Sequence, residues 1–60
     1  MPNKEMLKAL IADPNFQNDP FSFALFNAVL HDKLTYSNGT IKSSRQKATM
    51  EDLKRQYERQ

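Results

Sequence analysis

The stretch DPFSFALFNAVLHDKL, residues 19–34, is the most apolar part of the chain. Asp19 is a preferred N-cap residue, and Pro20 is favoured at the first helical position, where a missing N–H loses no partner. The pattern therefore predicts a helix over residues 20–33. Its apolar side chains point around most of the circumference, which is typical of a helix buried on several sides.

A second helix is expected upstream, over residues 3–13. Asn3 is a suitable N-cap, and Glu5 lies in the first turn, where the helix dipole favours an anion. The apolar residues Met6, Leu7, Leu10 and Ile11 recur at helical spacing and form one face. Pro14 ends the helix because the residue before a proline is pushed out of the helical region. We expect Phe16, in the following loop, to pack back onto the core.

Downstream, residues 35–42 contain Asn38-Gly39 between β-forming residues. This dipeptide is a strong hairpin signal because both central residues of a type I′ turn need a positive φ. Tyr36 and Ile41 would then face each other across the two strands. The strands would be only two or three residues long, so a plain loop is an equal alternative.

Two capping signals compete for the start of the last helix. Ser43 with Gln46 would start it early, and Thr49 with Asp52 would start it late. We expect a long helix over about residues 44–59, with an irregularity near Thr49.

Together these elements predict an all-α fold in a single domain of residues 1–60. The domain would have three helices, at about 3–13, 20–33 and 44–59, with room for a very short hairpin at 35–42. A chain of this length buries only about 60% of the surface that its unfolded form exposes, so its stability is marginal. With no cysteine, disulfides and thiolate zinc sites are excluded. A compact core, self-association or a larger partner must supply the stability.

The composition argues against catalysis. The chain has one histidine, one glycine and no cysteine. His31 and Asp32 are neighbours that point about 100° apart around a helix, so Asp32 does not orient the imidazole. We interpret His31 as a surface residue near a helix C-terminus, where a cation is favoured. Because Gly39 belongs to the turn, no phosphate-cradling loop can be built.

The run Asp13-x-Asn15-x-Gln17-x-Asp19 is similar to the start of a calcium loop. It has asparagine where the turn needs glycine and Ala24 where a bidentate glutamate belongs, so we interpret its acids as helix-terminal residues. We therefore expect no enzyme activity, no cofactor, no metal and no small-molecule substrate.

Two features suggest contact with another protein. Residues Met50, Leu53 and Tyr57 form a stripe at helical spacing that either packs on the second helix or docks in a partner's groove. Four phenylalanines lie within residues 16–26, which is more than so short a chain easily encloses. The residues predicted to bind a partner are Met50, Leu53, Tyr57, Arg55, Arg59, Phe23 and Phe26.

Charge is distributed unevenly. Residues 1–34 carry three lysines against four acids, whereas residues 35–60 carry six basic residues against three acids. This asymmetry can mark an interaction segment. If the protein binds nucleic acid, the residues predicted to contact the phosphate backbone are Lys42, Arg45, Lys47, Lys54, Arg55 and Arg59.

The leading functional hypothesis is a non-catalytic module that docks on a larger protein as an inhibitor, adaptor or regulator. Small accessory proteins of viruses and mobile elements have this size and composition, which is an analogy only. One alternative is a nucleic-acid-binding regulator, dimeric, that uses residues 42–59. Another is a structural subunit of an assembly. We expect a cytoplasmic protein, because no signal-peptide pattern is visible and the apolar run from Phe21 to Leu30 is too short to span a bilayer.

Overall fold

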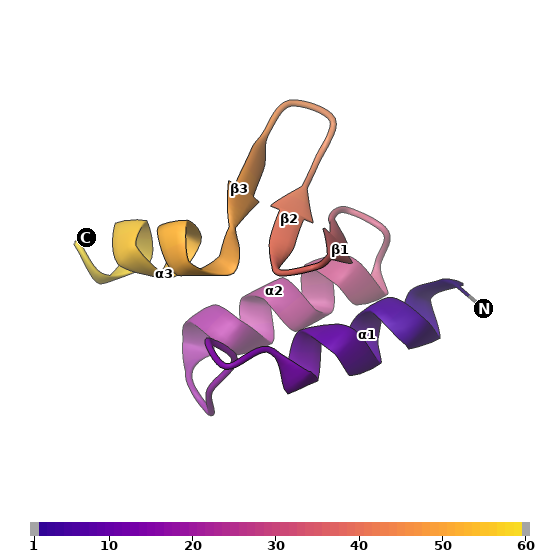
Figure 1. The fold of residues 1–60 in the computed structure, drawn as a ribbon, viewed down its shortest axis with the longest axis horizontal. Coiled ribbons are helices and arrows are strands. Elements are labelled where there is room, and N and C mark those ends of the chain that lie inside the picture. The colour runs from indigo at the N-terminus through magenta and orange to yellow at the C-terminus, as the bar shows by residue number, and fades with distance from the viewer. Residues whose placement is uncertain (1, 60) are drawn as a thin grey trace.

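The computed structural model describes residues 2–59. The element order is α1 (Pro2–Ala12), α2 (Pro20–Leu30), β1 (Thr35–Ser37), β2 (Thr40–Lys42), β3 (Lys47–Thr49) and α3 (Met50–Glu58). Helices α1 and α2 lie side by side, the strands stand against them, and α3 lies beyond β3 (Figure 1). The three strands form one antiparallel sheet in the order β1-β2-β3. Among residues 2–59, no helix is long and apolar enough to cross a membrane.

The prediction of an all-α fold is wrong, because the three-stranded sheet makes this a mixed α/β structure. Residues 44–49, expected to begin the third helix, form the β2–β3 loop and strand β3. The early capping signal is in fact a turn: Ser43 Oγ accepts hydrogen bonds from the backbone N–H of Arg45 (3.3 Å) and Gln46 (3.1 Å). A serine hydroxyl that accepts a nearby N–H closes a loop as readily as it caps a helix.

The late capping signal is the one that starts α3. Thr49 Oγ1 accepts a hydrogen bond from the N–H of Asp52 at 3.0 Å. At the start of α2, Asp19 Oδ1 likewise accepts from the N–H of Ser22 at 2.8 Å, as the sequence predicts. Helix α2 ends at Leu30, three residues before the expected boundary.

Between the two alternatives for residues 35–42, the hairpin is correct. Asn38 has φ 50° and Gly39 has φ 79°, so both central residues have the positive φ that the turn needs. Tyr36 pairs with Ile41 across the strands, and both side chains are buried. The sheet therefore turns this face towards the helices.

Asn3 does not cap α1. It lies inside that helix, and its Nδ2 donates to the carbonyl oxygens of Val29 (3.4 Å) and Leu30 (3.3 Å) at the end of α2. The last carbonyls of a helix lack intrahelical partners, and an antiparallel neighbour can satisfy them from its first turn. Asn3 thus ties the start of α1 to the end of α2.

The core lies between the helical pair, the sheet and the start of α3. Its buried apolar side chains are Leu10, Phe21, Leu25, Val29, Tyr36, Ile41 and Met50. Met50 is 1% exposed, and Leu53 packs against the same cluster. The ring of Tyr57 lies 5.3 Å from that of Phe21 at an interplanar angle of 42°. This stripe of α3 therefore packs inward on the core, and Tyr57 at its end contacts α2 through Phe21.

Candidate interaction surfaces

The outer face of α2 carries an apolar stripe, which we define as Phe23, Phe26 and Leu30. Phe23 is 50% exposed and Leu30 is 44% exposed, while Phe26 is half-buried against the core. The spacing i, i+3, i+7 places all three on one side of the helix. None of the 11 residues of α2 is charged. The stripe is thus a helix face without any charge of its own.

Two other large apolar side chains are exposed among the described residues. Ile11, on α1, is 53% exposed, and Tyr57 is 45% exposed although one side of its ring meets Phe21. Single exposed apolar residues are ordinary on a protein surface. The stripe on α2 differs because its members recur at helical spacing.

Four of the six cations predicted to follow a phosphate backbone gather beside β3. Lys47, Arg55 and Arg59 line one hollow between β3 and α3, together with Asp52 and Gln56. Arg45 and Lys47 line an adjoining hollow, again with Gln56. We call these two hollows the basic groove and its cations Arg45, Lys47, Arg55 and Arg59. Residues from the β2–β3 hairpin and from α3 thus meet although 14 positions separate Arg45 from Arg59.

The acids near the basic groove only partly neutralise it. Arg55 Nη2 lies 3.3 Å from Glu51 Oε1, and Arg55 Nη1 lies 3.5 Å from Asp52 Oδ1. All three side chains are at least half exposed, and ion pairs in that setting contribute little. Arg55 therefore remains available to an anionic ligand.

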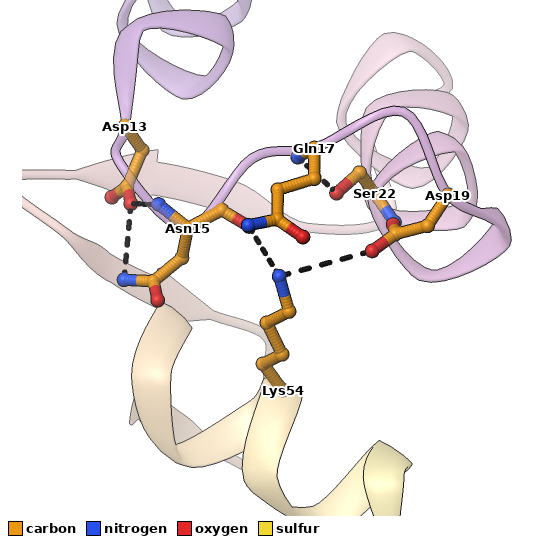
Figure 2. A network of polar contacts seen from close by, with 6 residues as sticks. All are labelled: Asp13, Asn15, Gln17, Asp19, Ser22 and Lys54. Atoms are coloured by element: carbon orange, nitrogen blue, oxygen red, sulfur yellow. Dashed lines mark hydrogen bonds and ion pairs between the residues drawn. The ribbon is translucent and has the colours of Figure 1, made fainter.

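The other two predicted cations lie elsewhere. Lys42 lines a separate hollow beside the α2–β1 loop. Lys54 points towards the α1–α2 loop, where its Nζ lies 3.8 Å from Asp19 Oδ2 and 3.4 Å from the carbonyl oxygen of Asn15 (Figure 2). The Lys54 side chain is only 15% exposed. It joins α3 to the α1–α2 loop and is not free to follow a backbone.

Asp19 contacts both Lys54 of α3 and Ser22 of α2. The N–H of Ser22, and then the Ser22 hydroxyl, lower the pKa of the Asp19 carboxyl, and Lys54 adds a smaller effect in the same direction. Ser22 is fully buried, and its Oγ accepts a hydrogen bond from the N–H of Gln17 at 2.9 Å. The polar residues of this loop are therefore engaged in holding the loop and α3 together.

A small apolar pocket of about 130 Å³ opens under the β2–β3 hairpin. Its apolar walls come from Leu25, Leu34, Ile41, Ala48 and Leu53. Ala48 and Leu53 also line the hollow that holds Arg45 and Lys47. The pocket and the basic groove are therefore one continuous surface along β3.

A buried polar pair was not predicted from the sequence. The hydroxyl of Tyr36 donates to Asp13 Oδ2 at 2.6 Å, and Asp13 Oδ1 accepts from Asn15 N at 2.8 Å and Asn15 Nδ2 at 3.3 Å. Burial, and then the Asp13 carboxylate, raise the pKa of Tyr36 to about 12. Asp13, the first acid of the calcium-like run, thus joins the α1–α2 loop to the sheet. Nothing in the sequence linked Asp13 to Tyr36.

His31 lies at the C-cap of α2 and is exposed, as its sequence position indicates. Within residues 2–59, no three side chains of the histidine, cysteine, aspartate or glutamate type come together as metal ligands would.

Leu30 is the site residue that sequence reasoning missed. It follows Phe23 by one heptad, so the spacing alone was a sufficient signal. The backbone edge of β3 was missed as well, since it exists only once β3 pairs with β2.

No protein-family description matches the chain, and neither curated proteins nor solved structures contain a match. Any functional conclusion therefore comes from the surfaces themselves.

Proposed function

We propose that the protein is a non-catalytic binding module that docks the apolar stripe of α2 into an apolar groove of a larger protein. The observation that carries this proposal is the half exposure of Phe23 and Leu30 at i, i+7 on an uncharged helix. Helix-in-groove recognition uses anchors with this spacing. Burying the exposed halves of the two side chains would contribute on the order of 2 kcal/mol.

The face of α3 is the weaker docking candidate of the two predicted for a protein partner. Met50 is buried and Leu53 is half-buried against the core, so Tyr57 is the one side chain of this stripe that is exposed to a docking helix. Roles as inhibitor, adaptor or regulator all follow from docking without chemistry. We place the module in the cytoplasm, a proposal supported by the lack of cysteine.

The test compares two sets of apolar residues of matched exposure. Tagged wild-type protein, a Phe23→Asp/Leu30→Asp double variant and an Ile11→Asp control would be used to capture partners from the native cell. A partner held by the wild type and the control but lost by the double variant supports docking through α2. Equal capture by all three proteins contradicts it. Circular dichroism spectra of all three proteins confirm that each is folded.

Light scattering on the same proteins tests the alternative occupant, a second copy. If the wild type is a dimer and the double variant a monomer, the α2 stripe is a self-association surface, and the proposal of a larger partner is wrong.

Nucleic-acid binding is the second candidate function, and the gathering of four cations in the basic groove favours it. Two observations count against it: Asp52 lines the basic groove together with the cations, and Lys54 is paired with Asp19. Binding to single- and double-stranded DNA should be strongest at low salt, about 50 mM, because the phosphate contribution is largest there. No binding under those conditions excludes this function.

A further inference from the structure

The outer edge of strand β3 is open. Strand order β1-β2-β3 places β2 on one side of β3, and among residues 2–59 no strand pairs with the other side. An edge strand presents unpaired N–H and C=O groups to any extended chain that fits beside it. The basic groove and the small apolar pocket border this edge.

The register of the β2–β3 ladder shows which backbone groups face outward. The N–H of Ser43 donates to the carbonyl of Gln46 at 2.8 Å, and the N–H of Met50 donates to that of Gly39 at 2.9 Å. Hydrogen-bonded and non-bonded pairs alternate along an antiparallel ladder. The bonded pair of β3 is therefore Ile41 with Ala48.

Lys47 and Thr49 belong to the non-bonded pairs, with Lys42 and Thr40 respectively. Their backbone groups point away from β2 and towards the open edge. The carbonyl of Thr49 is taken by the first turn of α3, because an N-cap carbonyl accepts the first intrahelical bond. The edge thus offers three groups: the N–H and C=O of Lys47 and the N–H of Thr49.

The surroundings of this edge select a particular kind of chain. On one side are the exposed cations of the basic groove, so acidic side chains would be attracted there. On the inner side Ala48 and Leu53 open onto the apolar pocket of about 130 Å³, room for one aliphatic side chain. Alternate residues of an extended strand face opposite sides, so an acidic–aliphatic alternation matches both.

We propose that the open edge of β3 binds an extended acidic segment of a partner protein by strand addition, with an aliphatic side chain in the pocket and carboxylates facing Lys47, Arg55 and Arg59. Strand addition takes its affinity from main-chain hydrogen bonds and its specificity from pockets for alternate side chains. The site is separate from the α2 stripe, so it stands or falls independently of the docking proposed above.

A second copy of this chain is a poor occupant. Pairing two β3 edges would bring Lys47 of each copy, or Arg45 and Lys47, close to one another without a compensating acid on the strand. Lysine on an edge strand is a common device against such self-pairing. A nucleic acid would meet the cations but leave the apolar pocket empty.

The probe is a capped hexapeptide that alternates glutamate with valine, titrated into the ¹⁵N-labelled protein at about 50 mM salt, where charge attraction is little screened. We expect the largest amide shifts at Lys47 and Thr49. The same peptide N-methylated at the amide that faces the Lys47 carbonyl keeps its charge but loses the one donor that this carbonyl accepts, and it should bind about tenfold more weakly, the loss of one net hydrogen bond.

Variants test the charges. Lys47→Glu combined with Arg55→Glu should weaken binding about tenfold or more, since two attractive contacts become repulsive. The matched control Lys4→Glu/Lys8→Glu reverses two exposed lysines on α1, neither of which lines the basic groove, and should leave the affinity within about twofold. All of the altered side chains are exposed, and circular dichroism confirms folding.

Three results would overturn the proposal. The first is no shift at Lys47 and Thr49 at millimolar peptide. The second is equal binding of the N-methylated peptide, which would mean diffuse charge attraction only. The third is displacement of the peptide from these residues by a single-stranded oligonucleotide at lower concentration, which would assign the groove to nucleic acid.

Discussion

At the scale of single residues, Asp13 joins two parts of the fold. One of its oxygens accepts from Asn15 in the α1–α2 loop, and the other accepts from the Tyr36 hydroxyl in β1. Asp13 is 9% exposed and Tyr36 is 7% exposed. A buried hydrogen bond to a charged group is worth more than a neutral one and is costly to break on one side. This contact holds the sheet to the end of α1.

The burial of Tyr36, together with its contact with Asp13, makes stability fall at high pH. The folded state raises the pKa of Tyr36 from 10.0 to about 12, so it holds the proton more tightly than the unfolded chain does. The stabilisation is complete below pH 10.0 and is lost as pH rises towards about 12. The free energy of unfolding, measured by urea denaturation, should fall more steeply across this range in the wild type than in Tyr36→Phe. If the free energies of unfolding of the two proteins fell in parallel with pH, the Tyr36 hydroxyl would not be stabilised by the fold.

Gly39 is needed for its backbone conformation. Its φ is 79°, and the nearest atom to an added Cβ, Asp13 Oδ2, would be 3.9 Å away, an ordinary contact. Gly39→Ala should therefore cost about 1–2 kcal/mol from the left-handed conformation alone. Gly39→Asn should cost less, because asparagine tolerates this region. Equal losses in the two variants, measured by urea denaturation, would contradict this explanation.

At the scale of elements, local signals predicted α1 and α2, and they gave the β1–β2 hairpin as one of two equal alternatives. Strand β3 was not predictable, because Lys47-Ala48-Thr49 contains little of the β-branched or aromatic character of strands, and pairing with β2 decides its conformation. The Ser43 hydroxyl added a false helix start. For the candidate surfaces, the sequence predicted which residues take part, such as Phe23 and the cations. It did not predict which cations lie together, since only the fold separates Lys54 from the basic groove.

The start of α3 depends on its cap. Thr49→Ala removes the acceptor of the Asp52 N–H, and we expect it to lower the free energy of unfolding by about 1 kcal/mol. Thr49→Ser keeps the hydroxyl and should restore most of the loss. Urea denaturation followed by far-ultraviolet circular dichroism measures both. A loss as large in Thr49→Ser as in Thr49→Ala would mean that the methyl group, not the hydrogen bond, matters.

At the scale of the whole molecule, the core that residues 2–59 form contains seven buried apolar side chains. A single core of this size rarely supplies more than about 3–5 kcal/mol. Leu10 and Val29 are fully buried at the contact of α1 with α2, while the sheet and Met50 close the other side. Any one of these side chains is thus a large share of the total stability.

Leu10→Ala should therefore unfold a large fraction of the molecules at 25 °C. Truncating a buried leucine costs about 2–5 kcal/mol, comparable with the whole stability of so small a domain. Phe23→Ala, at a side chain that is 50% exposed, should leave the protein folded. The dispersion of amide signals in proton NMR spectra distinguishes the two outcomes, and a well-folded Leu10→Ala protein would show that the core is sturdier than its size suggests.

The order of the elements has a consequence for kinetics. Most consecutive pairs meet in space, from α1 with α2 to β3 with α3, while β1 packs mainly on α1, and such largely local topology permits folding within microseconds to milliseconds. The contact of Lys54 with Asn15 spans 39 positions, so it closes a long loop at a high cost in chain entropy. We expect α3 to attach last on refolding and to detach first in native-state hydrogen exchange, while the α1–α2 pair stays protected.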